Sequence, residues 1–554
     1  MIAASECNSK PSRRQFLQSG ARSGATAMAI ARLKQARDPS VDVSTVKPFE
    51  LDDVTIGVLQ ERMKSGRLTA GYLVEEYIRR VEEIDRNGPG LNSVIEINPD
   101  ARAIADALDK ERKAKRARGP MHGIPVLIKD NIATRDRMST TAGSLALVGS
   151  VPPADSFVAE RLRAAGAVIL GKTNLSEWAN IRSSHSTSGW SARGGLTRNP
   201  YALDRNACGS SSGSGAAVAA NLCAVAVGTE TDGSIVCPSS ANGIVGIKPT
   251  LGLVSRNGIV PIAHSQDTAG PMARTVADAA ILLGALAGVD PRDGATAESQ
   301  GKAAQDYAQF LDSKGLRGAR IGVVRKLFGF HDGVDRLMNA AMEQMKRQGA
   351  DLVDPVTIDS LGDAESRSSM FEESEQEVLL YELKADLNAY LAALGPGAPV
   401  HSLQEIIDFN TRNRDKEMPF FGQDLFVKAQ AKGPLTDKPY LDALEKNHRL
   451  ARTEGIDAAM DKDHLDALIA PTGGPAWLTD LVDGDHDLGG SSSLAAVAGY
   501  PNINVPAGFI FGLPVGIAFF GRAYSEPTLI KLAYAFEQAT KARQPPKFLP
   551  RVKV

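Results

Sequence analysis

Short apolar runs that alternate with helical stretches constrain the fold of this chain most strongly. Gly123 to Lys129 (GIPVLIK) has the composition of a buried strand, and so does Ala167 to Leu170. A helix is expected between them, over Ser156 to Ala165, and helix and strand alternate again from Ala216 to Val227. This alternation predicts an α/β fold, in which helices pack on a sheet.

Strand character returns near the end of the chain. Apolar runs at 465–469, 503–506 and 515–520 precede a closing helix over about 526–541. The sheet is therefore expected to use both ends of the sequence. A length of 554 residues favours several domains. No low-complexity linker divides the chain, however, so we expect one large domain over residues 46–554.

A charged segment interrupts the strand pattern. Residues from about 295 to 465 contain long helical stretches, such as 372–394, and lack the loops rich in Gly and Ser that occur earlier in the chain. We interpret this segment as an inserted helical lobe. It is called the roof below, because it is expected to lie over the site.

The first 45 residues are interpreted as an export leader and a disordered arm. Ser12 to Gln18 (SRRQFLQ) is similar to a twin-arginine signal, and the weakly apolar run Ser23 to Ala31 ends in Ala-Ile-Ala, which fits a cleavage site. Export to the periplasm or the cell exterior is therefore expected. The alternative is a basic arm without a targeting role on a cytoplasmic protein. No run of eighteen apolar residues occurs, so no membrane span is expected.

Composition argues against several partners. The 63 Lys and Arg residues nearly balance the 65 Asp and Glu residues, which provides no field to hold nucleic acid. The basic run Lys110 to Arg118 is interpreted as a solvated helix face. The cysteines show no CxxC spacing and the histidines no HExxH motif, so neither a metal nor another cofactor is expected. Cys208, Cys223 and Cys237 are interpreted as small buried packing residues.

Two short motif matches conflict with their surroundings. Gly166 to Thr173 (GAVILGKT) fits the Walker A expression, but its middle is an apolar strand instead of a loop that could cradle phosphate. Gly209 to Gly213 (GSSSG) fits the nucleophile elbow, which would make Ser211 the nucleophile and His264 a nominal base. The preceding residues resemble a loop, although an elbow needs a strand there. Neither match is expected to carry function.

Lysine is the base that the sequence offers to a serine nucleophile. Lys129 ends a buried apolar strand, and Ser234 follows Thr-Asp-Gly in a turn. A lysine can accept a proton near neutral pH only if burial lowers its pKa from about 10.4 to about 7–8. Two alternatives remain open at this point. Lys129 could form a structural ion pair with Asp130, and Ser234 could be the N-cap of a helix.

A long stretch resolves these alternatives by resemblance. Cys208 to Thr250 (CGSSSGSGAAVAANLCAVAVGTETDGSIVCPSSANGIVGIKPT) resembles the Gly/Ser-rich signature of the amidase signature family. The resemblance extends to GIPVLIKDNI before it, and to SQDTAGPMARTVADAA and LPVGIAFFGRAYSEPTLIKLAYAFEQAT after it. It covers most of Asp52 to Lys541. Within the family, TETDGSIVCP and MPFFGQ (Met418 to Gln423) are most similar to bacterial peptide amidases.

The resemblance implies a fold and a set of roles. The fold is a single domain with a central mixed sheet flanked by helices. Ser234 is implied to be the nucleophile, Lys129 the base, and Ser210, after a cis peptide bond, the serine that passes the proton between them. The backbone N–H groups implied to form the oxyanion hole belong to Thr231, Asp232, Gly233 and Ser234. Many members carry arginine where this chain has Val236, which leaves open how the loop is supported.

The implied activity is hydrolysis of carboxamide bonds through an acyl-enzyme. Expected substrates are peptides with C-terminal amides, or other primary or aryl amides, and no nucleic acid is expected to bind. A related alternative is an esterase or carbamate hydrolase, because the same groups cleave better leaving groups. Another is the transfer-RNA amidotransferase subunit of this family, and a third is a binding protein with idle catalytic residues. The sequence does not predict the oligomeric state.

Overall fold

An eleven-stranded mixed sheet organises the residues that the computed structural model describes, which are 46–362 and 370–552. The leader expected over residues 1–45 lies outside the described residues. From one edge of the sheet to the other, the strands are β1 (Val94–Ile97), β3 (Val168–Thr173), β2 (Pro125–Lys129), β6 (Val225–Glu230), β8 (Thr268–Ala273), β7 (Val245–Lys248), β12 (Asn502–Ile510), β13 (Leu513–Phe520), β11 (Ala467–Pro471), β9 (Arg320–Val323) and β10 (Asp351–Val353). The short strands β4 (Trp190–Ser191) and β5 (Gly195–Leu196) form a separate ribbon.

The strand directions confirm the expected mixed sheet. β2 runs parallel to both β3 and β6, and β9 runs parallel to both β10 and β11. The strands between β6 and β11 pair antiparallel. Because β12 pairs with β7, the C-terminal strands complete the sheet that the N-terminal half begins. All residues of β2, β3 and β6 are buried, which explains their continuous apolar sequences.

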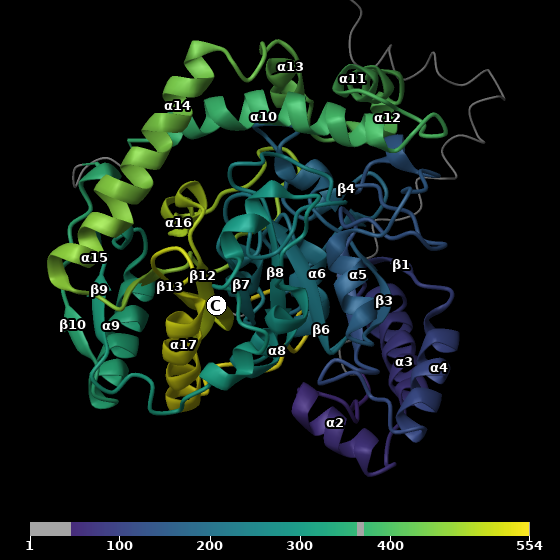
Figure 1. The fold of residues 1–554 in the computed structure, drawn as a ribbon, viewed down its shortest axis with the longest axis horizontal. Helices are drawn as coiled ribbons and strands as arrows, with labels where there is room; N and C mark the ends of the chain where they lie inside the picture. Colours follow the sequence, from purple (N-terminus) through teal and green to yellow (C-terminus); the bar gives the residue numbers. More distant parts are fainter. Residues whose placement is uncertain (1–45, 363–369, 553–554) are drawn as a thin grey trace, which may run out of the picture. The chain divides into compact units, whose positions relative to one another are not determined.

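Helices pack against this sheet in two groups. α5, α8, α17 and α9 pack successively on one another and on the strands, whereas α6 and α7 pack together against the middle strands (Figure 1). Outside the roof the helices are α2 (Ile56–Lys64), α3 (Ala70–Arg80), α4 (Ala101–Lys113), α5 (Phe157–Ala164), α6 (Ser212–Ala219), α7 (Val236–Ala241), α8 (Val276–Leu286), α9 (Asp332–Arg347), α15 (Asp457–Asp463), α16 (Ser492–Ala498) and α17 (Glu526–Thr540). This arrangement confirms the expected α/β class.

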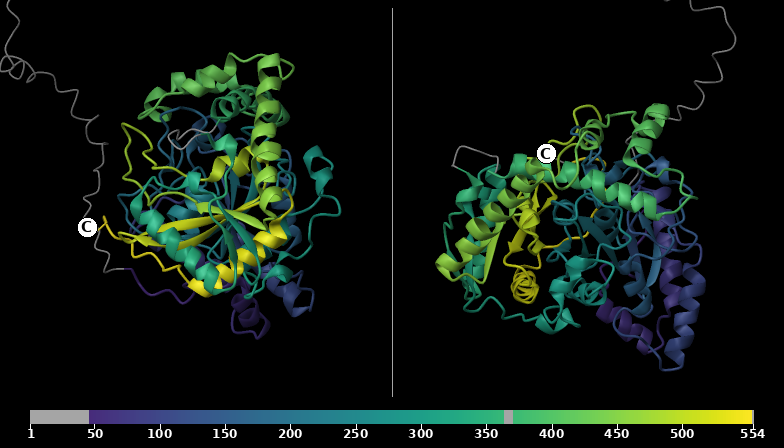
Figure 2. Two further views of the ribbon diagram at one scale, coloured as in Figure 1. Left: turned by 90° about the vertical axis from the view of Figure 1, so that its left-hand side faces the viewer. Right: turned by 45° about the horizontal axis from the view of Figure 1, so that its top comes forward.

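The roof begins later in the chain than the sequence indicates. Its helices are α10 (Glu372–Ala393), α11 (Leu403–Arg412), α12 (Arg414–Glu417), α13 (Asp424–Gln430) and α14 (Lys438–His448), which lie together at one end of the sheet (Figures 1 and 2). The expected boundary at residue 295 is wrong, because β9, α9 and β10 belong to the sheet. α9 has charged residues on its outer side and buries Val334, Met338 and Met345, so its charge does not mark a separate lobe.

The structure also shows where the basic run and the Walker A match of the sequence lie. Lys110 to Arg118 lies at and beyond the end of α4, with most of its residues exposed, as a solvated helix end should be. The Walker A match falls on β3, whose six residues are buried in the sheet, so it forms no phosphate loop. Among the described residues, no helix is long and apolar enough to cross a membrane.

Candidate active site

The lysine that ends β2 is buried beside a serine. Lys129 Nζ lies 2.8 Å from Ser210 Oγ and 2.8 Å from Thr229 Oγ1, and the Lys129 side chain is fully buried. Burial lowers the Lys129 pKa to about 7, although the charges of Asp267 and Glu230 act in the opposite direction. Around pH 7 a large fraction of the amine is therefore neutral and can accept a proton from the Ser210 hydroxyl.

The structural ion pair considered for Lys129 does not form. The neighbouring Asp130 carboxylate lies 3.2 Å from the guanidinium of Arg193 instead, and it accepts a hydrogen bond from Thr141 Oγ1. Within the described residues, Lys129 Nζ contacts hydroxyl and carbonyl oxygens and makes no ion pair. The strand end thus directs Lys129 and Asp130 to different partners.

Ser210 and Ser211 occupy different environments although they are adjacent. The peptide bond between Gly209 and Ser210 is cis, as the resemblance implies, and both serines are fully buried. Ser211 Oγ donates to Thr229 O at 3.0 Å and accepts from Thr229 N at 3.2 Å. These bonds tie Ser211 to β6. His264, its nominal base, is hydrogen-bonded to Asp386 at 2.8 Å, so the nucleophile elbow is not assembled.

The loop from Thr231 to Ser234 lies between β6 and α7. Gly233 has a φ of +76°, which favours glycine, and this conformation makes the turn possible. Ser211 N donates to Ser234 O at 3.2 Å, so the two serine-bearing loops are in contact. Ser234 is 8% exposed, and its hydroxyl has no hydrogen-bond partner within the described residues. Because α7 begins at Val236 without a side-chain cap, Ser234 is not its N-cap.

A buried glutamate supports this loop. Glu230 Oε2 accepts hydrogen bonds from Ile235 N at 2.7 Å and from Val236 N at 3.0 Å. Val236 itself is fully buried and offers no charge to the site. The sequence interpretation missed both Thr229 and Glu230. Their position at the end of the buried strand β6, directly before Thr-Asp-Gly-Ser, is the signal that could have identified them.

A disulfide joins the two serine-bearing loops, which corrects the interpretation of these cysteines as packing residues. Cys208, two residues before Ser210, is bonded to Cys237, three residues after Ser234. Their Cα atoms are 6.0 Å apart, although 29 positions separate them in the sequence. The absence of a CxxC motif in the sequence therefore could not exclude a disulfide between these two distant cysteines. Cys223 is free and buried, as expected.

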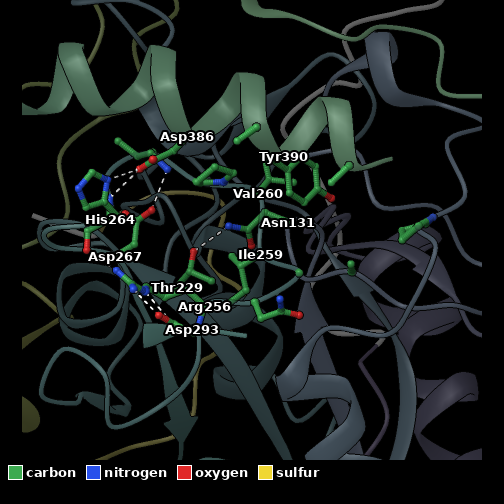
Figure 3. A pocket seen from close by; sticks show the side chains of 18 of the residues that line it. Asn131, Thr229, Arg256, Ile259, Val260, His264, Asp267, Asp293, Asp386 and Tyr390 are labelled. Carbon is green, nitrogen blue, oxygen red and sulfur yellow. Dashed lines mark hydrogen bonds and ion pairs between the residues drawn. The ribbon is translucent and has the colours of Figure 1, made fainter. Parts of the chain in front are cut away.

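A cavity of about 560 Å³ reaches the site from below the roof. Ser210, Thr229 and Thr231 line its inner end, while Lys129 and Ser234 are not among its lining residues. Figure 3 places Asp386 and Tyr390 on the helix above this cavity. The other lining residues include an apolar wall formed by Val260, Pro261, Ile262, Ala389 and Leu394.

Several charged groups around the cavity are paired with opposite charges within the protein. Arg256 Nε donates to Asp293 at 2.9 Å, and Arg292 Nε donates to Asp290 at 2.8 Å. Asp386 is paired with His264. The apolar wall is thus the main surface that remains for contact with a ligand.

Known proteins resemble this chain in sequence and in fold. The family model described as Amidase matches residues 72–530, so the chain belongs to the amidase family. A protein of Arabidopsis thaliana named "Probable amidase" is 44% identical over 506 residues, which are 90% of this chain and 93% of the relative. A glutamyl-tRNA(Gln) amidotransferase subunit of Synechococcus sp. strain WH7803 is 34% identical, over 90% of this chain and all of the relative.

Solved structures agree with this assignment. The native peptide amidase of Stenotrophomonas maltophilia is 52% identical with a TM-score of 0.85, covering 90% of this chain and 99% of that one. A structure of the peptide amidase PAM in complex with the competitive inhibitor chymostatin gives a TM-score of 0.86 at the same identity, over 90% of this chain and all of that one. The protein is therefore an amidase, a hydrolase of carbon–nitrogen bonds.

Proposed function

We propose that this amidase removes the C-terminal carboxamide group of peptides and releases ammonia, with Ser234 as nucleophile, Ser210 as proton carrier and Lys129 as base. The observation that carries the proposal is the contact of 2.8 Å between Lys129 Nζ and Ser210 Oγ in a fully buried setting. A serine hydroxyl needs a base to become a nucleophile. Neutral Lys129 is the base that this geometry provides.

The reaction proceeds in two steps. Ser234 Oγ attacks the amide carbonyl carbon while its proton passes through Ser210 to Lys129. The proton then returns to the amide nitrogen, the carbon–nitrogen bond breaks, and ammonia leaves an acyl-enzyme on Ser234. Water, deprotonated through the same groups, attacks the acyl carbon, and breakage of the ester bond restores Ser234 and releases the carboxylic acid.

The loop before Ser234 is suited to stabilise the charge that develops on the carbonyl oxygen. The backbone N–H groups of Asp232, Gly233 and Ser234 have no acceptor within the described residues. Free amides in a buried turn are suited to form an oxyanion hole, in which one donor contributes about 3–4 kcal/mol to stabilising the transition state. Thr231 is the fourth residue expected in the oxyanion hole. Its side-chain hydroxyl donates a hydrogen bond to the Asp267 carboxylate.

Two observations support a peptide as the substrate. The cavity has an apolar wall that includes Val260, Ile262 and Leu394, which suits a hydrophobic side chain next to the carboxamide. The chain is also more similar to the S. maltophilia peptide amidase, at 52% identity, than to the amidotransferase relative, at 34%. Activity of the purified single chain on a peptide amide would argue against the amidotransferase alternative.

We further propose that the protein is exported. The paired arginines Arg13 and Arg14 support this proposal. The bond between Cys208 and Cys237 supports it independently, because disulfides persist in oxidising compartments and are rare in the cytosol. Cell fractionation of the Arg13→Lys/Arg14→Lys variant tests it. Wild type is expected outside the cytoplasm and the variant within it. Wild type that remains in the cytoplasm would overturn the proposal, and unchanged export of the variant would overturn the role of the paired arginines.

Release of ammonia from an amidated dipeptide tests the catalytic assignments. Ser234→Ala and Lys129→Met are each expected to lower kcat by about 10⁴-fold or more. Lys172→Met is a matched control, because Lys172 is equally buried but donates to Thr140 Oγ1 at 2.9 Å, away from the serines. Folded Lys172→Met should keep kcat within about threefold. If Ser211→Ala loses activity while Ser234→Ala keeps it, the assignment of the nucleophile is wrong.

A further inference from the structure

The first turn of the roof helix α10 meets the loop that carries the nucleophile. Glu375 lies in this turn and is 8% exposed. Its carboxyl group is close enough to interact with the carboxyl group of Asp232, which directly precedes Gly233 and Ser234. A side chain from the roof thus reaches the catalytic loop, 143 positions earlier in the sequence.

A glutamine forms a second link between the same parts. Gln266 Nε2 donates to Glu375 Oε1 at 2.9 Å and to Thr231 O at 3.4 Å. Gln266 is 1% exposed. Glu375 therefore contacts the loop at two points, through Asp232 and through the partner of Thr231.

The contact between the two acids requires a proton. Asp232 Oδ2 accepts from Ser493 Oγ at 2.6 Å, but Asp232 Oδ1 is buried and has no N–H or hydroxyl donor within the described residues. A protonated Glu375 can supply that missing donor. Burial and the charge of Asp232 raise the Glu375 pKa well above its usual value. The structure is thus consistent with one proton shared by two carboxyl groups.

We propose that Glu375 is a positioning residue, which fixes the loop Thr231 to Ser234 against the roof through Asp232 and Gln266. This inference deepens the proposed function and rests on it, because it assumes that the loop binds the carbonyl oxygen. Loss of the proton from Glu375 would leave two negative charges in contact. Their repulsion would displace the loop and reduce catalysis as pH rises through the raised Glu375 pKa.

Other charged groups near Glu375 and Asp232 affect which of these two carboxyl groups holds the proton. Glu372, in the same turn of α10, raises the Glu375 pKa further. Burial raises the Asp232 pKa, whereas the hydrogen bond from Ser493 of α16 and the charge of Lys248, at the end of β7, act to lower it. These groups favour Asp232 as the ionised member and Glu375 as the protonated one.

Replacement of Glu375 by glutamine tests its positioning role in a variant that is expected to keep the fold. In Glu375→Gln, the side-chain amide can donate to Asp232 and accept from Gln266 without titrating. We expect kcat on a peptide amide to stay within about threefold of wild type at pH 7.5. We expect the wild-type kcat to decline as pH rises through the raised Glu375 pKa, and this decline should be absent from the variant. Glu373→Gln is the matched control, because it removes one exposed carboxylate from the same turn and should keep the decline.

Removal of the Glu375 side chain is expected to impair catalysis, whereas its replacement by glutamine is not. Glu375→Ala leaves Asp232 and Gln266 without their partner, so kcat should fall by about 10- to 100-fold while KM changes little. A wild-type kcat that does not decline up to pH 10 would overturn the inference, and so would a Glu375→Gln variant that keeps the decline. If Glu375→Ala does not fold, the Glu375→Gln profile decides alone.

Unfolding measurements distinguish this inference from the proposed function. A carboxyl group whose pKa is raised by folding lowers stability progressively as pH rises above its unfolded pKa. Glu375→Gln should therefore unfold at higher temperature than wild type, by a margin that grows from pH 6 to pH 9. This readout does not depend on catalysis, whereas Ser234→Ala tests the nucleophile without involving the roof. A margin that does not change with pH would refute the shared proton.

Discussion

Removal of the disulfide is expected to destabilise the protein and to disturb both serine-bearing loops. The bond joins Cys208 to Cys237 across 29 positions. In the chain-entropy model, closing a loop of this size removes about 12 cal/mol/K of entropy from the unfolded chain, which corresponds to about 3.6 kcal/mol at 25 °C. Cys208→Ala/Cys237→Ala should therefore lower the free energy of unfolding by about 3–4 kcal/mol.

Urea unfolding, with and without a thiol reductant, measures this effect. Wild type should lose stability when reduced, whereas the double variant should not respond to the reductant. Cys223→Ala is the control, because Cys223 is a buried free cysteine and the variant keeps the disulfide. It should respond to reductant as wild type does.

The same bond should matter for catalysis, because Cys208 lies two residues before Ser210 and Cys237 lies three residues after Ser234. The double variant is expected to have a lower kcat at temperatures where it remains folded. The reasoning fails if fully reduced wild type, with its free thiols counted by mass spectrometry, is as stable and as active as the oxidised protein.

Three further predictions concern the buried charges. Because Lys129 must be neutral to act as base and has a pKa of about 7, kcat/KM should fall about tenfold per pH unit below that value; a flat profile down to pH 5 contradicts this role. The negative charge of Asp267 raises the Lys129 pKa, so Asp267→Asn should move this limb to lower pH, and a move to higher pH would be inconsistent. Arg182→Met should lower the free energy of unfolding in urea by about 3–5 kcal/mol, because Glu177 and Glu417 would be left buried without their cation; unchanged stability would refute this.

The sheet was predictable because its inner strands are apolar along their whole length. The run that ends in Lys129 forms β2, and the apolar runs near the C-terminus form β11, β12 and β13. The start of the roof was not predictable. β9 and β10 have four and three residues, too few for a clear pattern, and the charged outer side of α9 hides its buried face.

The residues of the proposed site could be inferred from the sequence only where a continuous motif or a recognisable strand carries them. Ser210 and Ser234 lie in one Gly/Ser-rich stretch, and Lys129 ends a recognisable strand. Glu375 could not be identified in this way. It contacts Asp232 across 143 positions, and in the sequence it is one of several glutamates in a charged helix. Contacts between distant segments depend on how the roof packs, which local patterns do not encode.

Identification of the acylated serine tests the central claim most directly. The enzyme is mixed with an activated ester of a short peptide, quenched in acid within the first turnover, and digested for peptide mass mapping. The account predicts an acyl group on Ser234 in wild type and no acylated peptide from Ser234→Ala. An acyl group on Ser211, or turnover without any acylated serine, would contradict the assignment of Ser234 as the nucleophile.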